Sequence, residues 1–131
     1  MIEKYLEQLR KELELGSLPP LNEEKEYHLQ LSNFNIGIKV SDTQYYFSSD
    51  IGPIPQNKRE DFLMRVMKAN FLGQGTGGAT IGLKEDESCL TLSLSLPYEM
   101  NYKTFKESLE DFVNYVSYWK QEIIQHEAEV N

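Results

Sequence analysis

Apolar side chains recur along the first half of the chain with two periods, and the change of period predicts its elements. Helical spacing begins at Ile2 and continues to Leu13, and Gly16 with the following Pro19-Pro20 ends it, so the sequence predicts a helix over 2–14. Three runs of period-two alternation follow, which predict an antiparallel three-stranded meander. These runs lie at residues 27–31, 34–40 and 45–47, with turn residues at Ser32-Asn33 and Ser41-Asp42 and a strand break from Ile51 to Pro55.

The second half repeats the same alternation of periods. A helix is predicted from about Asn57 to Leu72, ending at Gly73, and Asn101 is a good N-cap for a last helix that runs to about Gln125. Two alternating strands, over 79–83 and 89–96, flank a polar turn between the helices. The order is therefore αβββαββα, and we expect an α+β fold with a twisted antiparallel sheet packed on helices, formed by one domain over residues 1–131.

The two long predicted helices differ in the width of their apolar face. In the last helix the apolar side chains cover an arc of roughly 120°, enough for one packing surface, whereas in the 57–72 helix they cover roughly 220° and leave only a narrow polar edge. One explanation is a central helix enclosed by its own fold, and the other is a helix whose second face meets a second copy. With only three helices to enclose it, the pattern favours a homodimer.

Charge and composition exclude several classes of partner. The 131 residues carry a net charge of −8, which repels nucleic acid and anionic membrane surfaces. The chain has no apolar run of about twenty residues, so we expect no membrane insertion. A lone cysteine, Cys89, and an N-terminus without a hydrophobic signal core indicate a cytoplasmic protein.

No residue pattern in the sequence indicates catalysis. Gly73 to Gly78 fits G-x-G-x-x-G, but a dinucleotide site needs a strand before the glycines and a helix after them, and here the order is reversed. The glycines are better explained as a helix cap and a sharp turn. His28 and His126 belong to no motif that pairs a histidine base with a nucleophile, and His126 is predicted to lie in a frayed C-terminal turn. No metal-ligand spacing occurs. We expect no enzyme, no metal and no cofactor.

One stretch resembles a known family. It combines the helix end Lys68-Ala69-Asn70-Phe71-Leu72, a glycine-rich turn, the Leu-rich strand closing on Leu96-Pro97, and the final Phe-rich amphipathic helix. Together these features resemble the class I chaperones of type III secretion effectors, the Tir chaperone family. The resemblance implies a cytosolic homodimer paired through the second helix and the fourth strand. Its interface would include Leu63, Met67, Asn70, Phe71 and Ile81.

The resemblance also implies a function. Such a chaperone binds the extended N-terminal segment of one or more secreted effectors and keeps them export-competent without ATP. An extended segment can add a strand to a sheet edge while its alternate side chains enter apolar pockets. The candidate partner-binding residues, each also a plausible core residue, are Leu9, Leu13, Phe34, Ile36, Ile38 and Phe47.

Two alternatives stay open from the sequence. A dimeric regulator of the same fold could sequester a partner that is not secreted. An enzyme that uses the glycine-rich turn is the more distant one.

Overall fold

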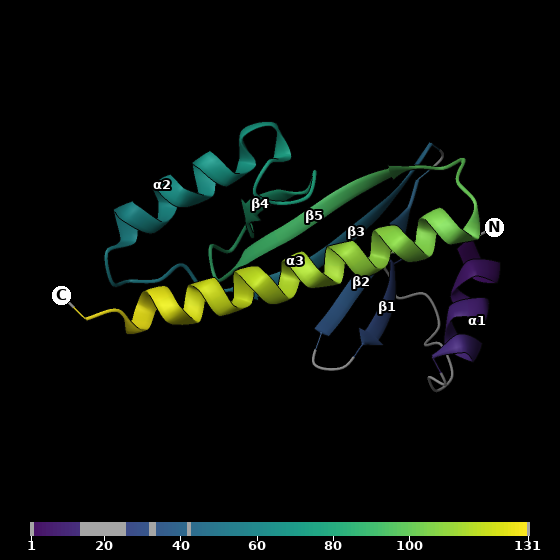
Figure 1. The fold of residues 1–131 in the computed structure, drawn as a ribbon, viewed down its shortest axis with the longest axis horizontal. Coiled ribbons are helices and arrows are strands. Elements are labelled where there is room, and N and C mark those ends of the chain that lie inside the picture. Colours follow the sequence, from purple (N-terminus) through teal and green to yellow (C-terminus); the bar gives the residue numbers. More distant parts are fainter. Residues whose placement is uncertain (1, 14–25, 32–33, 42, 131) are drawn as a thin grey trace.

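The computed structural model describes residues 2–13, 26–31, 34–41 and 43–130. It contains a five-stranded sheet with one long helix across one face and two shorter helices at its ends (Figure 1). The α+β fold and the αβββαββα order are therefore confirmed. The elements are α1 (Ile2–Glu12), β1 (Glu26–Leu31), β2 (Phe34–Val40), β3 (Gln44–Gly52), α2 (Arg59–Asn70), the 3₁₀ turn η1 (Phe71–Gly73), β4 (Thr80–Leu83), β5 (Leu90–Pro97) and α3 (Tyr102–Ala128).

The sheet has the order β1-β2-β3-β5-β4, and every neighbouring pair is antiparallel. The predicted meander is formed by β1, β2 and β3. The predicted strand break at Ile51 is wrong, because β3 continues to Gly52 and places Ile51 in the core, with a register irregularity between Asp50 and Gly52. The predicted turn at 32–33 and the end of the first predicted helix beyond residue 13 lie outside the described residues.

One face of the sheet and the apolar stripe of α3 form the core. Asn101 caps α3 as predicted, since its Oδ1 accepts a hydrogen bond from the Thr104 amide at 2.8 Å. Alternate strand residues point at the helix, and the Phe47 ring lies 5.7 Å from the ring of Phe105 and 5.6 Å from that of Phe112. Burial of these large rings is the main source of stability in the core.

The shorter helices lie at opposite ends of α3 (Figure 1). At the N-terminal end, Glu12 of α1 accepts hydrogen bonds from Tyr102 and Lys106 of α3, each at 2.8 Å. At the other end, the ring of Phe62 on α2 packs edge-on against Trp119. The distance between α1 and α2 leaves most of the sheet to be covered by α3 alone.

The last turns of α3 are firmly joined to the segment before α2. The Glu127 carboxylate accepts the amides of Gln56 and Asn57, at 2.6 and 3.3 Å. His126 is buried, its Nε2 lies 3.0 Å from the Lys58 carbonyl oxygen, and its ring packs on Phe62. The prediction of a frayed turn at His126 is wrong, because these long-range contacts fix the end of the helix.

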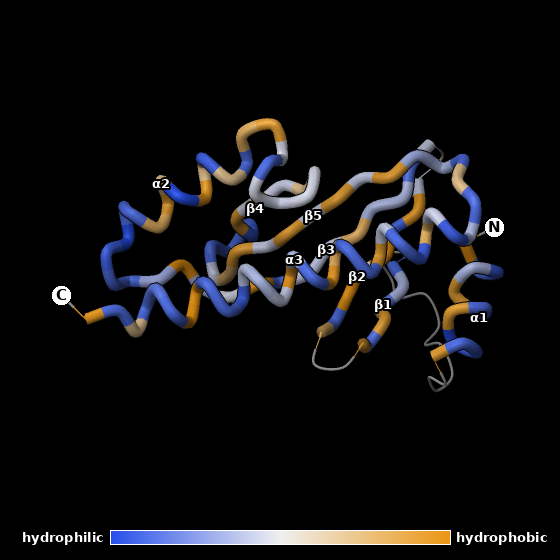
Figure 2. The backbone as a smooth tube through the Cα atoms, in the orientation of Figure 1, coloured by the Kyte–Doolittle hydropathy of each residue, from blue (hydrophilic) through white to orange (hydrophobic). Residues whose placement is uncertain are grey.

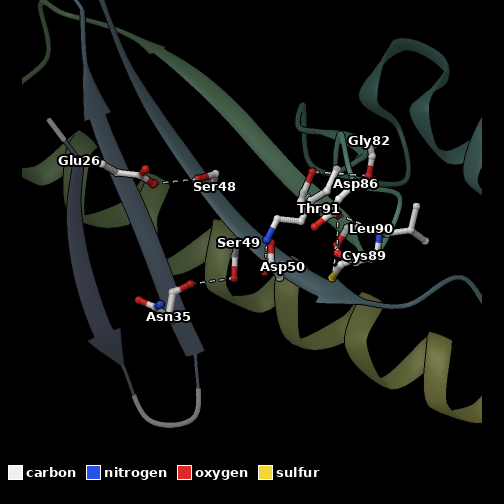
Figure 3. A network of polar contacts seen from close by, with 12 residues as sticks. Glu26, Asn35, Ser48, Ser49, Asp50, Gly82, Asp86, Cys89, Leu90 and Thr91 are labelled. Carbon is white, nitrogen blue, oxygen red and sulfur yellow. Dashed lines mark hydrogen bonds and ion pairs between the residues drawn. The ribbon is translucent and has the colours of Figure 1, made fainter. Parts of the chain in front are cut away.

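The sheet forks between β2 and β3. Their pairing ends at Gly37 and Ser48, although β2 continues along β1 and β3 continues along β5. Beyond this point the Ser49 hydroxyl donates to the Asn35 carbonyl oxygen at 3.0 Å. Figure 3 shows Asn35 and Ser49 on the two sides of the opening. A hydrogen bond from a side chain thus takes the place of the next backbone pairing between β2 and β3.

Candidate partner-binding surfaces

The second face of α2 is exposed. Phe62, Val66 and Ala69 are buried against the fold, and the opposite side presents apolar side chains to solvent. The enclosed-helix interpretation is therefore wrong, because no other element covers this face among the described residues. Figure 2 shows hydrophobic positions at the end of α2 and in the turn that follows. The α2 patch consists of Met64 and Met67 on α2 and of Phe71 and Leu72 in the turn that follows.

The five predicted interface residues divide into three groups. Met67 and Phe71 are 69% and 64% exposed and belong to the α2 patch. Leu63 is half-buried, and the Ile81 side chain is buried. Asn70 is half-buried and bonded within its own chain. The prediction that these residues pair with a second copy therefore rests mainly on Met67 and Phe71.

Asn70 occupies the outer edge of β4. Its side-chain amide donates to the Ile81 carbonyl at 3.0 Å, and its Oδ1 accepts the Ile81 amide at 2.8 Å. β4 is the last strand of the sheet, so these two backbone groups face away from β5. The side chain of Asn70 satisfies them as a neighbouring strand would.

The glycine-rich turn packs against the protein's own last helix. Gly73 and Gly77 have φ values of 67° and 65°, a conformation that favours glycine. A Cβ atom on Gly77 would lie 2.3 Å from the ring of Tyr115. The Trp119 indole donates to the Gly75 carbonyl at 3.1 Å. The glycines are thus accounted for by tight turns and close packing, and the segment connects a helix to a strand, the wrong order for a dinucleotide site.

An apolar hollow of about 180 Å³ lies between α1, α3 and the end of β1. We call it the α1 hollow, and its apolar wall consists of Leu9, Leu13, Leu31, Leu109 and Val113, with Lys106, Glu110 and Asn114 at its polar side. Leu13 is 46% exposed at this site. Leu109 is a buried core residue at the base of the hollow, whereas Leu31 and Val113 are half-buried, and periodicity alone does not separate such a core face from an open groove.

The predicted partner-binding residues are not all accessible. The side chains of Leu9, Ile36, Ile38 and Phe47 are in the core, so they support any binding surface from beneath. Leu13 lines the α1 hollow, and Phe34 is half-buried at the start of β2. The structure thus brings only Leu9 and Leu13 together in one hollow, and of the six only Leu13 and Phe34 are open to a partner.

A larger, mainly polar hollow of about 530 Å³ lies at the fork between β2 and β3. We call it the fork hollow. Glu26, Asn35 and Ser48 line it from the first three strands, and Lys84 pairs with Asp50 at 3.1 Å at the side of β5. Lys120 reaches it from α3. Figure 3 shows the hydrogen bonds from Ser48 to Glu26 and from Ser49 to Asn35 in this region.

The hydrogen bonds that join α1 to α3 also shift pKa values. Lys106 and Tyr102 donate to the Glu12 carboxylate and hold the pKa of that group below its ordinary value of 4.5. Glu12 in return raises the pKa of Lys106. Burial, followed by the bond to Glu12, raises the pKa of Tyr102 to about 12. At neutral pH the three groups therefore form a charged, hydrogen-bonded contact.

The described residues contain no group of three or more His, Cys, Asp or Glu side chains able to hold a metal ion. In the same part of the chain, no helix is long and apolar enough to cross a membrane.

The fold and its surfaces define the class of protein: a sheet under one long helix, with exposed apolar side chains at α2 and an apolar hollow beside α1. The chain belongs to the Tir chaperone protein (CesT) family, whose sequence model matches residues 4–120. This confirms the resemblance inferred from the sequence and the functional class, a chaperone of type III secretion. The family is not a known class of enzymes.

Solved structures agree on the fold at low sequence identity. A chain of the ExsC–ExsE complex has a TM-score of 0.75 at 13% identity, covering 93% of this chain and 92% of its own. One in the HopA1–SchA chaperone–effector complex has a TM-score of 0.73 at 12% identity, covering 92% and 93%. YbjN, a putative transcription regulator from E. coli, has a TM-score of 0.62 at 17% identity, covering 94% and 91%. No curated protein matched the sequence.

Proposed function

We propose that the protein is a cytoplasmic homodimeric chaperone that binds an extended N-terminal segment of a type III secretion effector, without ATP and without catalysis. The chaperone class follows from the family. The proposal adds the dimer, the form of the bound segment and the independence from ATP.

The exposed α2 patch is the observation that carries the proposal. Met67, Phe71 and Leu72 are each more than 60% exposed and lie on consecutive elements, the end of α2 and η1. Large contiguous apolar patches on soluble proteins usually mark contacts with other polypeptides. A second copy that covers the patch with about 800 Å² per partner would remove these side chains from water.

The α1 hollow supports binding of an extended segment. It is small, apolar and open at Leu13, which suits the side chain of one apolar residue better than a folded domain. Ordering an extended segment costs several kcal/mol of the interaction energy, about 2–5 or more, so several such contacts must act together. Two copies in a dimer would present two α1 hollows to one long segment.

Purification of the tagged protein from its native cell, followed by mass spectrometry, tests the proposal. The expected result is an effector that remains bound when ATP is removed with apyrase. The bound effector should also be protected from protease only in its N-terminal part. Recovery of no effector or secretion component would contradict the proposal.

The likeness to YbjN favours one alternative, a regulator of the same fold that sequesters a partner that is not secreted. The same purification separates the two functions. A transcription or stress factor as the main stoichiometric partner would favour the regulator.

A further inference from the structure

A second apolar hollow adjoins the fork hollow. It has a volume of about 380 Å³ and lies between the end of β3, the start of β5 and the last third of α3. Pro53, Cys89 and Ile124 contribute to its wall, and Ile124 is 61% exposed. Asp50 and Lys120 line both this hollow and the fork hollow. The two hollows therefore adjoin at these two side chains, and we call them together the groove, polar on the side of the fork hollow and apolar on the side of Ile124.

Lys120 is the unmatched charge where the two hollows meet. Asp50 is already paired with Lys84, and Lys120 makes no ion pair with any carboxylate of the described residues. Its ammonium group lies 5.0 Å from the ring centre of Phe34, a cation–π contact that holds the side chain across the groove. The half-buried Lys120 side chain in this position favours a carboxylate from a partner.

The spacing of the two side chains suits an extended segment. Lys120 and Ile124 are one turn apart on α3, a rise of about 6 Å along the helix. Alternate side chains of an extended strand are about 6.7 Å apart and point to the same side. A strand that runs along this flank of α3 can therefore present one side chain to Lys120 and the next but one to the hollow at Ile124.

We propose that this groove binds an acidic–x–apolar sequence, in either chain direction, within the effector segment. The carboxylate pairs with Lys120, and the apolar side chain fills the hollow at Ile124. This inference rests on the proposed function and specifies the chemistry of the bound segment. The protein as a whole carries a charge of −8, which repels acidic ligands, so a site that selects an acidic residue acts against the overall charge.

The test uses the effector fragment recovered by the purification described above, with its affinity measured by fluorescence anisotropy. Lys120→Met keeps the aliphatic stem and removes the charge, and Ile124→Ser removes the apolar contact. Each should weaken binding about three- to tenfold, as expected for one partly exposed ion pair or one apolar contact. Lys103→Met, the same change at an exposed position of α3 outside both hollows, should leave the affinity within twofold.

A charge exchange makes the test independent of folding. Lys120→Glu should weaken binding further, and replacing the acidic residue of the effector motif with Lys should restore affinity to that variant alone. If the wild type binds the fragment and neither Lys120→Met nor Ile124→Ser changes the affinity, the groove does not bind the effector segment. The proposed chaperone function is unaffected by that result. A changed oligomeric state of Ile124→Ser would overturn the proposal in favour of a second copy in the groove. If the wild type binds no effector, both proposals fail.

Discussion

Asn70 pairs with Ile81 through both backbone groups of that residue, so that a side chain closes the outer edge of the sheet. An open edge strand is a site for uncontrolled pairing with other chains. Because the edge of β4 is closed at Ile81, a second copy that approaches the α2 patch meets side chains there and not a free strand edge.

The first prediction concerns this pair. Asn70→Ala leaves the amide and carbonyl of Ile81 without protein partners and should lower the free energy of unfolding by about 1–3 kcal/mol. Asn70→Asp keeps an acceptor for the Ile81 amide but sets a carboxylate oxygen against the Ile81 carbonyl oxygen, so it should also lower the free energy of unfolding. Urea denaturation followed by the fluorescence of Trp119, the sole tryptophan, measures both. A free energy of unfolding of Asn70→Ala equal to that of the wild type would show that the two hydrogen bonds between Asn70 and Ile81 contribute little.

The second prediction concerns the α2 patch. Met67→Glu places a charge on a side chain that is 69% exposed, so the folded chain should tolerate it, while a dimer would have to bury the carboxylate. Light scattering should give the mass of a single 15.2 kDa chain for this variant and twice that for the wild type. Leu13→Glu is the matched control, because it puts the same charge on an exposed leucine at the α1 hollow and should leave the dimer intact. An unchanged dimer in Met67→Glu would remove the α2 patch from the interface.

The sequence predicted the apolar faces of the elements well, because burial in a strand or helix follows its period. The last helix is predicted to have one apolar packing surface, and the side chains at helical spacing that form it are all buried: Phe105, Leu109, Phe112, Val116, Trp119 and Ile123. The same rule could not separate core from groove, which is why Ile36, Ile38 and Phe47 were considered for partner binding. All three are fully buried in the core of the structure.

The contacts that shape the candidate sites depend on residues far apart in the chain. Lys120 lies over Phe34 because α3 crosses the sheet next to the start of β2, and Glu127 reaches Gln56 because α3 extends to Ala128, beyond its predicted end. No local pattern signals either pair. The fork was also not predictable, since β2 and β3 alternate normally and their divergence appears only in the pairing register.

The third prediction concerns the glycine-rich turn. Gly77→Ala should lower the free energy of unfolding by more than the roughly 1–2 kcal/mol that the left-handed conformation costs a residue with a side chain. The additional loss is expected because the new Cβ would overlap the Tyr115 ring. Gly78 has a positive φ of 88° with open space around a Cβ, so Gly78→Ala isolates the cost of the conformation. The difference between the free energies of unfolding of the two variants, measured by urea denaturation, gives the cost of the close contact with Tyr115 on α3. A difference near zero would mean that the turn moves away from Tyr115 at little cost.

The fourth prediction concerns pH and the junction of α1 with α3. The pKa of Glu12 in the folded protein is below its ordinary value of 4.5, because Lys106 and Tyr102 bond to the ionised form. Its contribution to stability is therefore fully present above about pH 4.5 and is lost as the pH falls through the lower, folded value. The Tm of Glu12→Gln should lie below that of the wild type at pH 7, and the gap should close in acid. Glu107→Gln, at an exposed carboxyl on α3 with no ion pair among the described residues, should show no such pH-dependent gap. A gap of constant size from pH 7 to pH 3 would show that the Glu12 charge does not stabilise the junction.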